Sequence, residues 1–406
     1  MALLTFDTAH KPRQAYASMG ILLVLMLAFP FFAAQFGNSW VRILDIALLY
    51  IMLALGLNIV VGFAGLLDLG YIAFFAVGAY LTGLLASPQF AALLESLVNY
   101  HPELQDAIVA TFGESVRTEG IHLSVWAIVP LAALMAALFG ALLGAPTLKL
   151  RGDYLAIVTL GFGEIIRIFM NNLNDPINFT NGPQGINLID PIRVFGVSLA
   201  GEPGSRATVF IGGYGMPSVN AYYFLFLLLC IVTIFMTGRL QHSRLGRAWV
   251  AIREDEIAAK AMGINTRNVK LLAFSMGASF GGVAGAMFAA FQGFVSPESF
   301  SFMESISVLA MVVLGGIGHI PGVVLGGVLL AALPEVLRHV VEPTQQALFG
   351  KVVIEAEVLR QLLYGLAMVL IMLYRPAGLW PSPVKEDRPV AATARDEEDE
   401  NEGKTA

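Results

Sequence analysis

Roughly ten apolar runs, each near the length needed to cross a lipid bilayer, recur along this chain of 406 residues. A bilayer core about 30 Å thick needs roughly 20 mostly apolar residues per helix. Only 13% of the residues are charged, about half the share found in an ordinary soluble domain. We therefore predict an all-α, polytopic membrane protein with about ten transmembrane helices, at approximately 17–34, 42–61, 66–86, 123–145, 154–171, 221–237, 269–293, 303–315, 323–340 and 358–373.

Three of these runs allow more than one interpretation. Run 303–315 is short, and run 323–340 follows it closely through the glycine-rich stretch 315–322. This pair forms either two crossings or one broken, re-entrant hairpin. Run 17–34 follows two basic residues, and its length favours a signal anchor over a cleaved signal peptide.

The distribution of basic residues predicts the orientation and the domain organisation. Lysine and arginine are more frequent in the segments that alternate crossing would place in the cytoplasm. The positive-inside rule then puts both termini in the cytoplasm. We expect a cytoplasmic segment 1–16, a transmembrane domain 17–375 and a disordered, acidic cytoplasmic tail 376–406. External loops are predicted at about 87–122 and 172–220, and a cytoplasmic loop at about 239–268.

Several classes of function lack their sequence signals. The single cysteine, Cys230, forms no disulfide framework, and the six histidines show no ligand spacing, so we expect no metal site. No basic run lies beside aromatic residues, which argues against nucleic-acid binding. The sequence also contains no Gly-x-x-x-x-Gly-Lys-Ser/Thr motif, so it lacks the signal of a P-loop ATPase. We expect this chain to bind no cofactor.

The densest charged part of the predicted cytoplasmic loop is typical of a short amphipathic helix, within 244–263. Glu254, Asp255 and Glu256 lie where the positive end of a helix dipole favours acids, and Gly263 can supply a left-handed stop. One face is apolar, with small alanines that allow another surface to approach closely. The segment either docks on a partner protein or lies as an ordinary loop on the membrane surface. The predicted apolar face consists of Ile257, Ala258, Ala261 and Met262.

Two pairs of opposite charges fall within or beside the runs. Glu164 and Arg167 are three residues apart, as are Arg42 and Asp45. Residues at this spacing share a helix face. We interpret both pairs as structural ion pairs rather than transport groups.

Asp68 has apolar neighbours and no nearby base. It either caps the start of a helix at the membrane edge or lies with Asn58 and Tyr71 near a substrate route, where it could meet an amino group. Glycines near residues 161, 277–285 and 322–327 recur at spacings that allow helices to pack closely.

Five motifs in order resemble the LivM-type permease family of branched-chain amino acid importers. They are GLNIVVGFAGLLDLGY at 56–71, LKLRGDYLAIVTLGFGEIIR at 148–167, LGRAWVAIREDE at 245–256, QGFVSPESF at 292–300 and VVLGG at 312–316. The spacing from Ala258 and Ala259 to Gly263 also resembles the EAA-type loop of ABC importer permeases. Ile257 stands where that loop usually has a glutamate. The acidic tail and the insertion 87–122 lie outside the resemblance.

This resemblance implies a type II ABC importer permease in a bacterial inner membrane. It implies a second permease chain of the LivH type, two cytoplasmic ATPase subunits that use ATP and Mg²⁺, and a periplasmic solute-binding protein that delivers leucine, isoleucine or valine. The chain itself would be a transport subunit and not an enzyme. The ATPase-coupling residues would be Arg253, Glu254, Asp255, Glu256, Ala258, Ala259, Ala261 and Gly263.

Two alternatives stay open. Permeases for urea, amides or other amino acids share the overall fold and some motifs. A secondary transporter would instead use a proton or sodium gradient, with Asp68 or Glu164 titrating in the membrane. An integral-membrane enzyme has no supporting arrangement of residues. For a leucine-like solute we expect a mainly apolar path with a few polar groups for the charged ends.

Overall fold

The computed structural model describes residues 26–147, 150, 152–194, 196–201, 208–211, 214–349, 356–375 and 378–380. The predicted segment 1–16, nearly all of the predicted tail and the first half of run 17–34 lie outside these ranges. Residues 26–33 are helical and are followed by η1 (Ala34–Phe36).

Long apolar helices confirm the all-α, polytopic class. Four described helices are long and apolar enough to cross a membrane: α2 (Asn38–Asn58) continued by the π-helical turn η2 (Ile59–Phe63), α7 (Val125–Thr147), α9 (Ser218–Gln241) and α12 (Thr266–Gln292). The other runs within the described residues are also helical, as α8 (Asp153–Asn172), α13 (Phe302–Gly315), α14 (Ile320–Phe349) and α15 (Ala356–Tyr374).

The run predicted at 66–86 is helical only in its second part. The chain turns at Gly65, whose φ is +68°, and α3 begins at Ile72 and ends at Leu85. It then bends by 80° into α4 (Gln89–Tyr100). The following predicted loop is helical rather than extended, with η3 (Pro102–Leu104), α5 (Gln105–Phe112) and α6 (Glu114–Glu119).

Glycines allow α12 to pack closely against α3 and α7, which confirms the prediction for residues 277–285, whereas a methyl group at Gly161 would meet no atom within 4 Å. A methyl group at Gly285 would overlap the backbone carbonyl oxygen of Phe75, and one at Gly78 would overlap that of Gly282. Both of these contacts lie between α12 and α3, and Gly282 also contacts Ala132 of α7. The glycine face of α12 is therefore covered by helices of the same chain.

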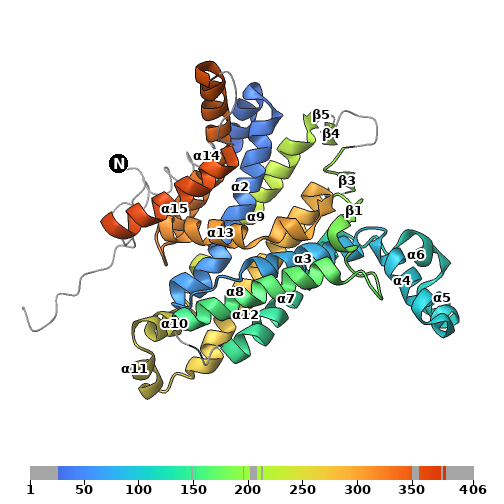
Figure 1. The fold of residues 1–406 in the computed structure, drawn as a ribbon, viewed down its shortest axis with the longest axis horizontal. Coiled ribbons are helices and arrows are strands. Elements are labelled where there is room, and N and C mark those ends of the chain that lie inside the picture. Colours follow the sequence, from blue (N-terminus) through green and yellow to red (C-terminus); the bar gives the residue numbers. More distant parts are fainter. Residues whose placement is uncertain are drawn as a thin grey trace, which may run out of the picture.

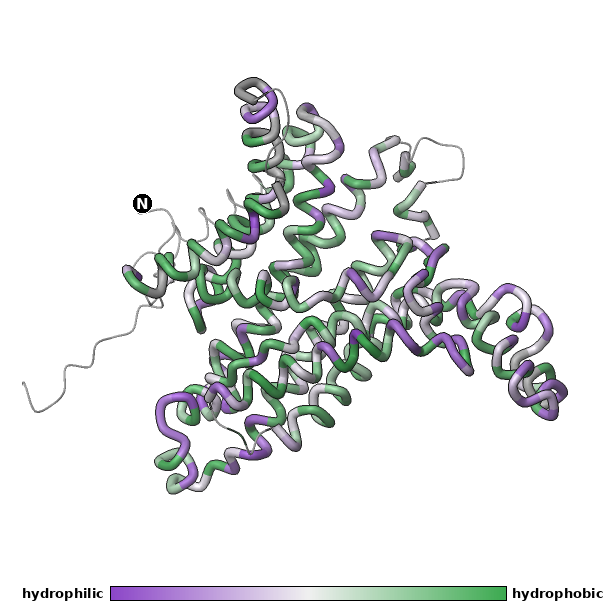
Figure 2. Tube along the Cα trace, in the orientation of Figure 1, coloured by the Kyte–Doolittle hydropathy of each residue, from purple (hydrophilic) through white to green (hydrophobic). Residues whose placement is uncertain are grey.

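Polar segments lie at opposite ends of the molecule. Figure 1 shows α10 and α11 at the lower left and α4 to α6 at the right. In Figure 2 these segments carry much of the hydrophilic colour, whereas the helices between them are mostly hydrophobic. The predicted loop 172–220 contains η4 (Gly182–Gln184) and short strands. Three antiparallel pairs form: β1 (Ile186–Asn187) with β6 (Phe294–Val295), β2 (Arg193–Val194) with β3 (Val197–Ser198), and β4 (Thr208–Ile211) with β5 (Tyr214–Pro217).

Candidate functional site: a buttressed cytoplasmic loop

The loop between α9 and α12 forms two helices where the sequence predicted one. α10 spans Arg244–Glu254 and α11 spans Glu256–Ala261. Between them Asp255 has extended backbone, and its Oδ1 accepts from the backbone N–H groups of Ile257 (2.7 Å) and Ala258 (3.0 Å). Asp255 is therefore the N-cap that starts a second helix. Gly263 follows with a φ of +86°, the predicted left-handed stop.

Two side-chain contacts hold this loop against α12. Trp249 of α10 is fully buried, and its Nε1 donates to the carbonyl oxygen of Val269 at 2.7 Å. The Nζ of Lys270 lies 2.7 Å from Oε1 of Glu256, and the side chain of Lys270 is only 8% exposed. Because a lysine loses hydration in such a place, its partner carboxylate is needed there. These contacts fix α10 and α11 relative to α12.

Arg253 connects the same loop to the break in α2. Its Nη1 donates to the carbonyl oxygen of Gly62 at 2.6 Å, within the π-helical turn η2. The amide of Gly318, in the turn between α13 and α14, donates to Oδ1 of Asn58 at 2.9 Å. A side chain at Gly318 would also contact the guanidinium of Arg253. One arginine thus links α10, the broken end of α2 and the α13–α14 turn.

α11 turns its predicted apolar face outward. Ile257 is 73% exposed and Met262 is 84% exposed, and Ala258 and Ala261 are also exposed. Ala259 instead points inward and is buried. Glu254 is exposed beside Arg253. The eight predicted coupling residues therefore have three different roles. Arg253, Glu256 and Ala259 attach the loop to the body, and Asp255 caps α11. The other four lie on the outside: Glu254, Ala258, Ala261 and Gly263.

The three predicted substrate-route residues are buried and hydrogen-bonded within the protein. Oδ1 of Asp68 accepts from the amide of Gly70 at 2.9 Å, so Asp68 stabilises the turn before α3 rather than capping the helix itself. Tyr71 donates to the carbonyl oxygen of Gly277 at 2.8 Å. Asn58 makes the contact with Gly318 described above. Each of these bonds fixes a bend or a close helix contact.

One of the two predicted ion pairs forms. Nη2 of Arg167 lies 2.8 Å from Oε2 of Glu164 on α8. The predicted pair of Arg42 with Asp45 is wrong. Arg42 instead donates to Oε1 of Gln292 and lies over the ring of Phe291, both at the end of α12. These contacts of Arg42 are made with α12, and both carboxylate oxygens of Asp45 are buried without a hydrogen-bond partner.

The two predicted external loops are joined to each other. Nδ1 of His122 lies 2.7 Å from Oδ2 of Asp190, and the amide of Asp190 donates to the carbonyl oxygen of Ala86. The hydrogen bond that the His122 ring donates to the Asp190 carboxylate raises the pKa of His122 above its usual value. Within the described residues no group of three or more His, Cys, Asp or Glu side chains could hold a metal ion.

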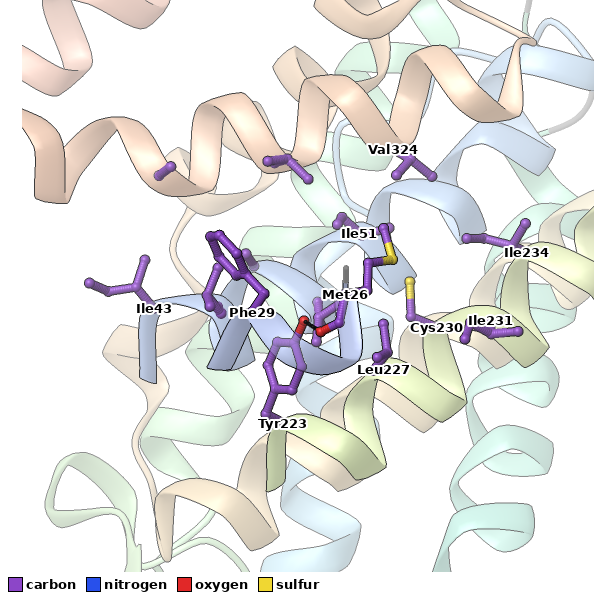
Figure 3. Close-up of a pocket in the computed structure, with 15 residues that line it drawn as sticks. Met26, Phe29, Ile43, Ile51, Tyr223, Leu227, Cys230, Ile231, Ile234 and Val324 are labelled. Atoms are coloured by element: carbon purple, nitrogen blue, oxygen red, sulfur yellow. Dashed lines mark hydrogen bonds between the residues drawn. The ribbon is translucent and has the colours of Figure 1, made fainter. Parts of the chain in front are cut away.

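A cavity of about 280 Å³ lies between residues 26–33, α2, α9 and α14. Figure 3 shows Met26, Ile51, Cys230 and Val324 around it, with the hydroxyl of Tyr223 turned toward the backbone of Met26. No charged side chain lines it. It offers hydrocarbon surface but no partner for the charged ends of an amino acid.

Sequence reasoning missed Glu304 of α13 and Arg360 of α15, which line one cavity. Both residues lie within predicted membrane runs, 303–315 and 358–373. Ionisable residues in such runs are functional candidates, so the signal was present. Their separation along the chain concealed that the fold brings them together.

A mostly apolar bundle with membrane-length helices and a buttressed, outward-facing loop is typical of an integral membrane protein. Residues 39–372 match the family described as branched-chain amino acid transport system / permease component, and the chain belongs to that family. It is 42% identical over 367 residues to the high-affinity branched-chain amino acid transport system permease protein LivM of Escherichia coli K12, covering 89% of this chain and 73% of that protein.

Two more distant relatives place the chain within the family. It is 27% identical over 345 residues to a probable branched-chain amino acid transport permease protein LivM of Methanocaldococcus jannaschii, covering 82% of this chain and 90% of the relative. It is 32% identical over 161 residues to the permease protein LivH of the Escherichia coli K12 system, covering 40% and 46%. No solved structure matches the chain.

Proposed function

We propose that this chain is the membrane-spanning subunit of an ATP-driven importer that moves leucine, isoleucine and valine into the cytoplasm. The observation that carries the proposal is the exposed α11 face on a loop attached to three parts of the helical body. The names of the relatives supply the substrate class. In this proposal the chain lies in a bacterial inner membrane with both termini in the cytoplasm.

The outer face of α11 provides the docking surface for a cytoplasmic ATPase. Ile257 and Met262 would enter an apolar groove of the partner, while the small side chains of Ala258 and Ala261 allow close approach. A displacement of α11 by the ATPase would be transmitted to α12 through the ion pair of Glu256 with Lys270. It would be transmitted to η2 through the hydrogen bond of Arg253 with Gly62. ATP and Mg²⁺ would be used by the ATPase subunits, with no cofactor bound by this chain.

Two further partners belong to the proposal. The resemblance to a LivH permease over 161 residues supports pairing with a second, related permease chain. The helical and stranded segments at the end opposite α11 would receive a periplasmic solute-binding protein. His122 and Asp190 hold these segments together there.

A double substitution tests the docking surface. Replacing Ala258 and Ala261 with arginine adds two bulky charges to the outer face of α11 and leaves the buried Ala259 unchanged. We expect the ATPase subunits to be lost on purification and radiolabelled leucine uptake into vesicles to stop. Ala110→Arg is the matched control for retention of the ATPase subunits, because Ala110 is an exposed helical alanine in α5, at the end of the molecule opposite α11. Normal uptake by the double variant would refute the docking role.

A further inference from the structure

A cavity of about 270 Å³ lies where α2, α13, α14 and α15 meet. Pockets for drug-sized ligands measure roughly 300–1,000 Å³, so this cavity suits a smaller molecule. Its lining differs from that of the apolar cavity beside Cys230, because it includes the side chains of Tyr50, Glu304 and Arg360. Ser307 and Tyr364 add two hydroxyl groups, and apolar side chains, including Ile43, Met311 and Leu330, form the rest of the wall.

The polar groups of the cavity are held in place by neighbouring helices. The hydroxyl of Tyr50 on α2 donates to Oε2 of Glu304 on α13 at 2.7 Å. The guanidinium of Arg360 lies over the ring of Tyr364, 5.9 Å from its centroid, and Tyr364 donates to the carbonyl oxygen of Leu330 at 2.6 Å. The acid and the base therefore come from different helices, and each is positioned by an aromatic residue.

These groups have the chemistry required by the two charged ends of an amino acid. A carboxylate has about four lone-pair sites, so Glu304 can accept from an ammonium group in addition to Tyr50. A guanidinium has five N–H donors in a planar fork that matches a carboxylate, so Arg360 can bind one beside its other contacts. Ile43, Met311 and Leu330 supply the apolar surface that a branched aliphatic side chain needs.

The cavity also lies away from the docking surface along α13. Glu304 is in the first turn of α13, while the last residue of that helix, Gly315, adjoins the turn that contacts Asn58. At 1.5 Å per residue these two ends are separated by about 16 Å. A ligand in the cavity is therefore near the end of α13 that faces away from α10 and α11. The same helix connects the ligand with the turn beside Arg253.

We propose that this cavity binds a zwitterionic, branched aliphatic amino acid during its passage through the permease. Glu304 receives the ammonium group, Arg360 receives the carboxylate, and the side chain lies against Ile43, Met311 and Leu330. This inference rests on the proposed transport function and adds the place where the solute is held. The alternative substrate route at Asp68, Asn58 and Tyr71 has no comparable cavity, because the space beside Asp68 measures only about 10 Å³.

Photo-crosslinking tests the location directly. The purified transporter complex, with its ATPases and binding protein, is reconstituted in vesicles and illuminated with the diazirine analogue of leucine. We expect labelled peptides from α2, α13 or α14 that carry Ile43, Met311 or Leu330, with labelling removed by excess leucine. Labelling confined to other helices, or labelling that leucine does not displace, would overturn the assignment.

A variant without the Glu304 charge tests how the cavity recognises the ammonium group. Glu304→Gln keeps the shape of the side chain but removes the charge that meets the ammonium group, and we expect leucine uptake to fall about tenfold or more. Glu298→Gln is the matched control, because Glu298 is an exposed carboxylate in η5 (Pro297–Phe300) that does not line the cavity. If the wild-type complex transports leucine and the Glu304→Gln complex transports it equally well, the proposed site is wrong. The proposed transport function would then still stand.

Two variants of Arg360 test the site independently if Glu304→Gln does not fold. Arg360→Lys keeps a positive charge for the carboxylate, whereas Arg360→Gln does not. We expect the first to retain part of the uptake and the second to lose it, with both complexes eluting as wild type from a sizing column. Equal uptake by both variants would overturn the role of Arg360. Absence of leucine uptake by the wild-type complex would instead refute the proposed function, and this inference with it.

Discussion

Polar side chains at the bends of this protein form hydrogen bonds with backbone groups that have no partner within a helix. Arg253 satisfies the Gly62 carbonyl oxygen in η2, and Asn58 accepts from Gly318. Asp68 accepts from Gly70 before α3. In the hydrocarbon core of a bilayer, each backbone N–H or C=O group without a hydrogen-bond partner costs on the order of several kcal/mol. Side chains at such positions are therefore needed for the fold before any transport role is considered.

Asp68 gives a test that separates ATP-driven from ion-coupled transport. Asparagine keeps an Oδ1 acceptor for the amide of Gly70 but cannot ionise. We expect Asp68→Asn to retain leucine uptake within about twofold of wild type, with uptake insensitive to a protonophore. Asp68→Leu removes the acceptor and should destabilise the protein by about 1–3 kcal/mol, measured as earlier thermal unfolding in detergent. Collapse of uptake in a well-folded Asp68→Asn variant would favour the ion-coupled alternative.

At the scale of single elements, α11 is too short to be stable by itself. A helix of six residues is far below the length at which isolated helices form in water. Its start depends on the Asp255 cap and its end on Gly263, and Ala259 and Glu256 connect it to the body. The docking surface is thus held in place by the Asp255 cap and by the contacts of Glu256 and Ala259 with the body, rather than by its own helical propensity.

Removing the cap should loosen α11 without disturbing the transmembrane helices. Asp255→Ala leaves the amides of Ile257 and Ala258 without their side-chain acceptor, at a cost of about 0.5–2 kcal/mol. We expect faster hydrogen exchange at residues 257–261 and weaker retention of the ATPase subunits. Asp255→Asn is the control, because asparagine caps helices about as well. Wild-type exchange rates in Asp255→Ala would contradict the importance of the cap.

At the scale of the whole molecule, close helix contacts set the shape of the central body. Lipid and protein interior are similarly apolar, so helices in a membrane associate through packing and hydrogen bonds rather than through the hydrophobic effect. The crossing of α3 and α12 at Gly78, Gly282 and Gly285 is such a contact. It also brings Tyr71 within hydrogen-bonding distance of Gly277.

A single added methyl group should disturb this crossing. Gly285→Ala places a Cβ against the Phe75 carbonyl oxygen, which is backbone and cannot rotate away. We expect a destabilisation of about 1–3 kcal/mol or more, measured as a lower midpoint of thermal unfolding in detergent. Gly161→Ala is the control, because the same methyl group in α8 meets no atom within 4 Å. Equal midpoints for the two variants would contradict the close packing.

Features that depend on neighbouring residues could be predicted from the sequence. The lengths and hydropathy of the apolar runs indicated the membrane class, since bilayer thickness fixes the length of a helix. The acids before residue 257 and the glycine at 263 indicated where a helix starts and stops, because the helix dipole and the left-handed stop act within one turn. The spacing of Ile257, Ala258, Ala261 and Met262 indicated their shared face, which the structure leaves exposed.

Which distant groups meet was decided only by the tertiary structure. Arg42 and Asp45 have the spacing of an ion pair, yet packing against α12 gives Arg42 a partner 250 residues away. Tyr50 and Glu304 are 254 residues apart and become hydrogen-bonded neighbours where four helices converge. Helix spacing determines which side chains share a face of one helix, but the crossing of several helices determines what that face meets. The cavity proposed to hold the solute therefore exists only in the folded chain.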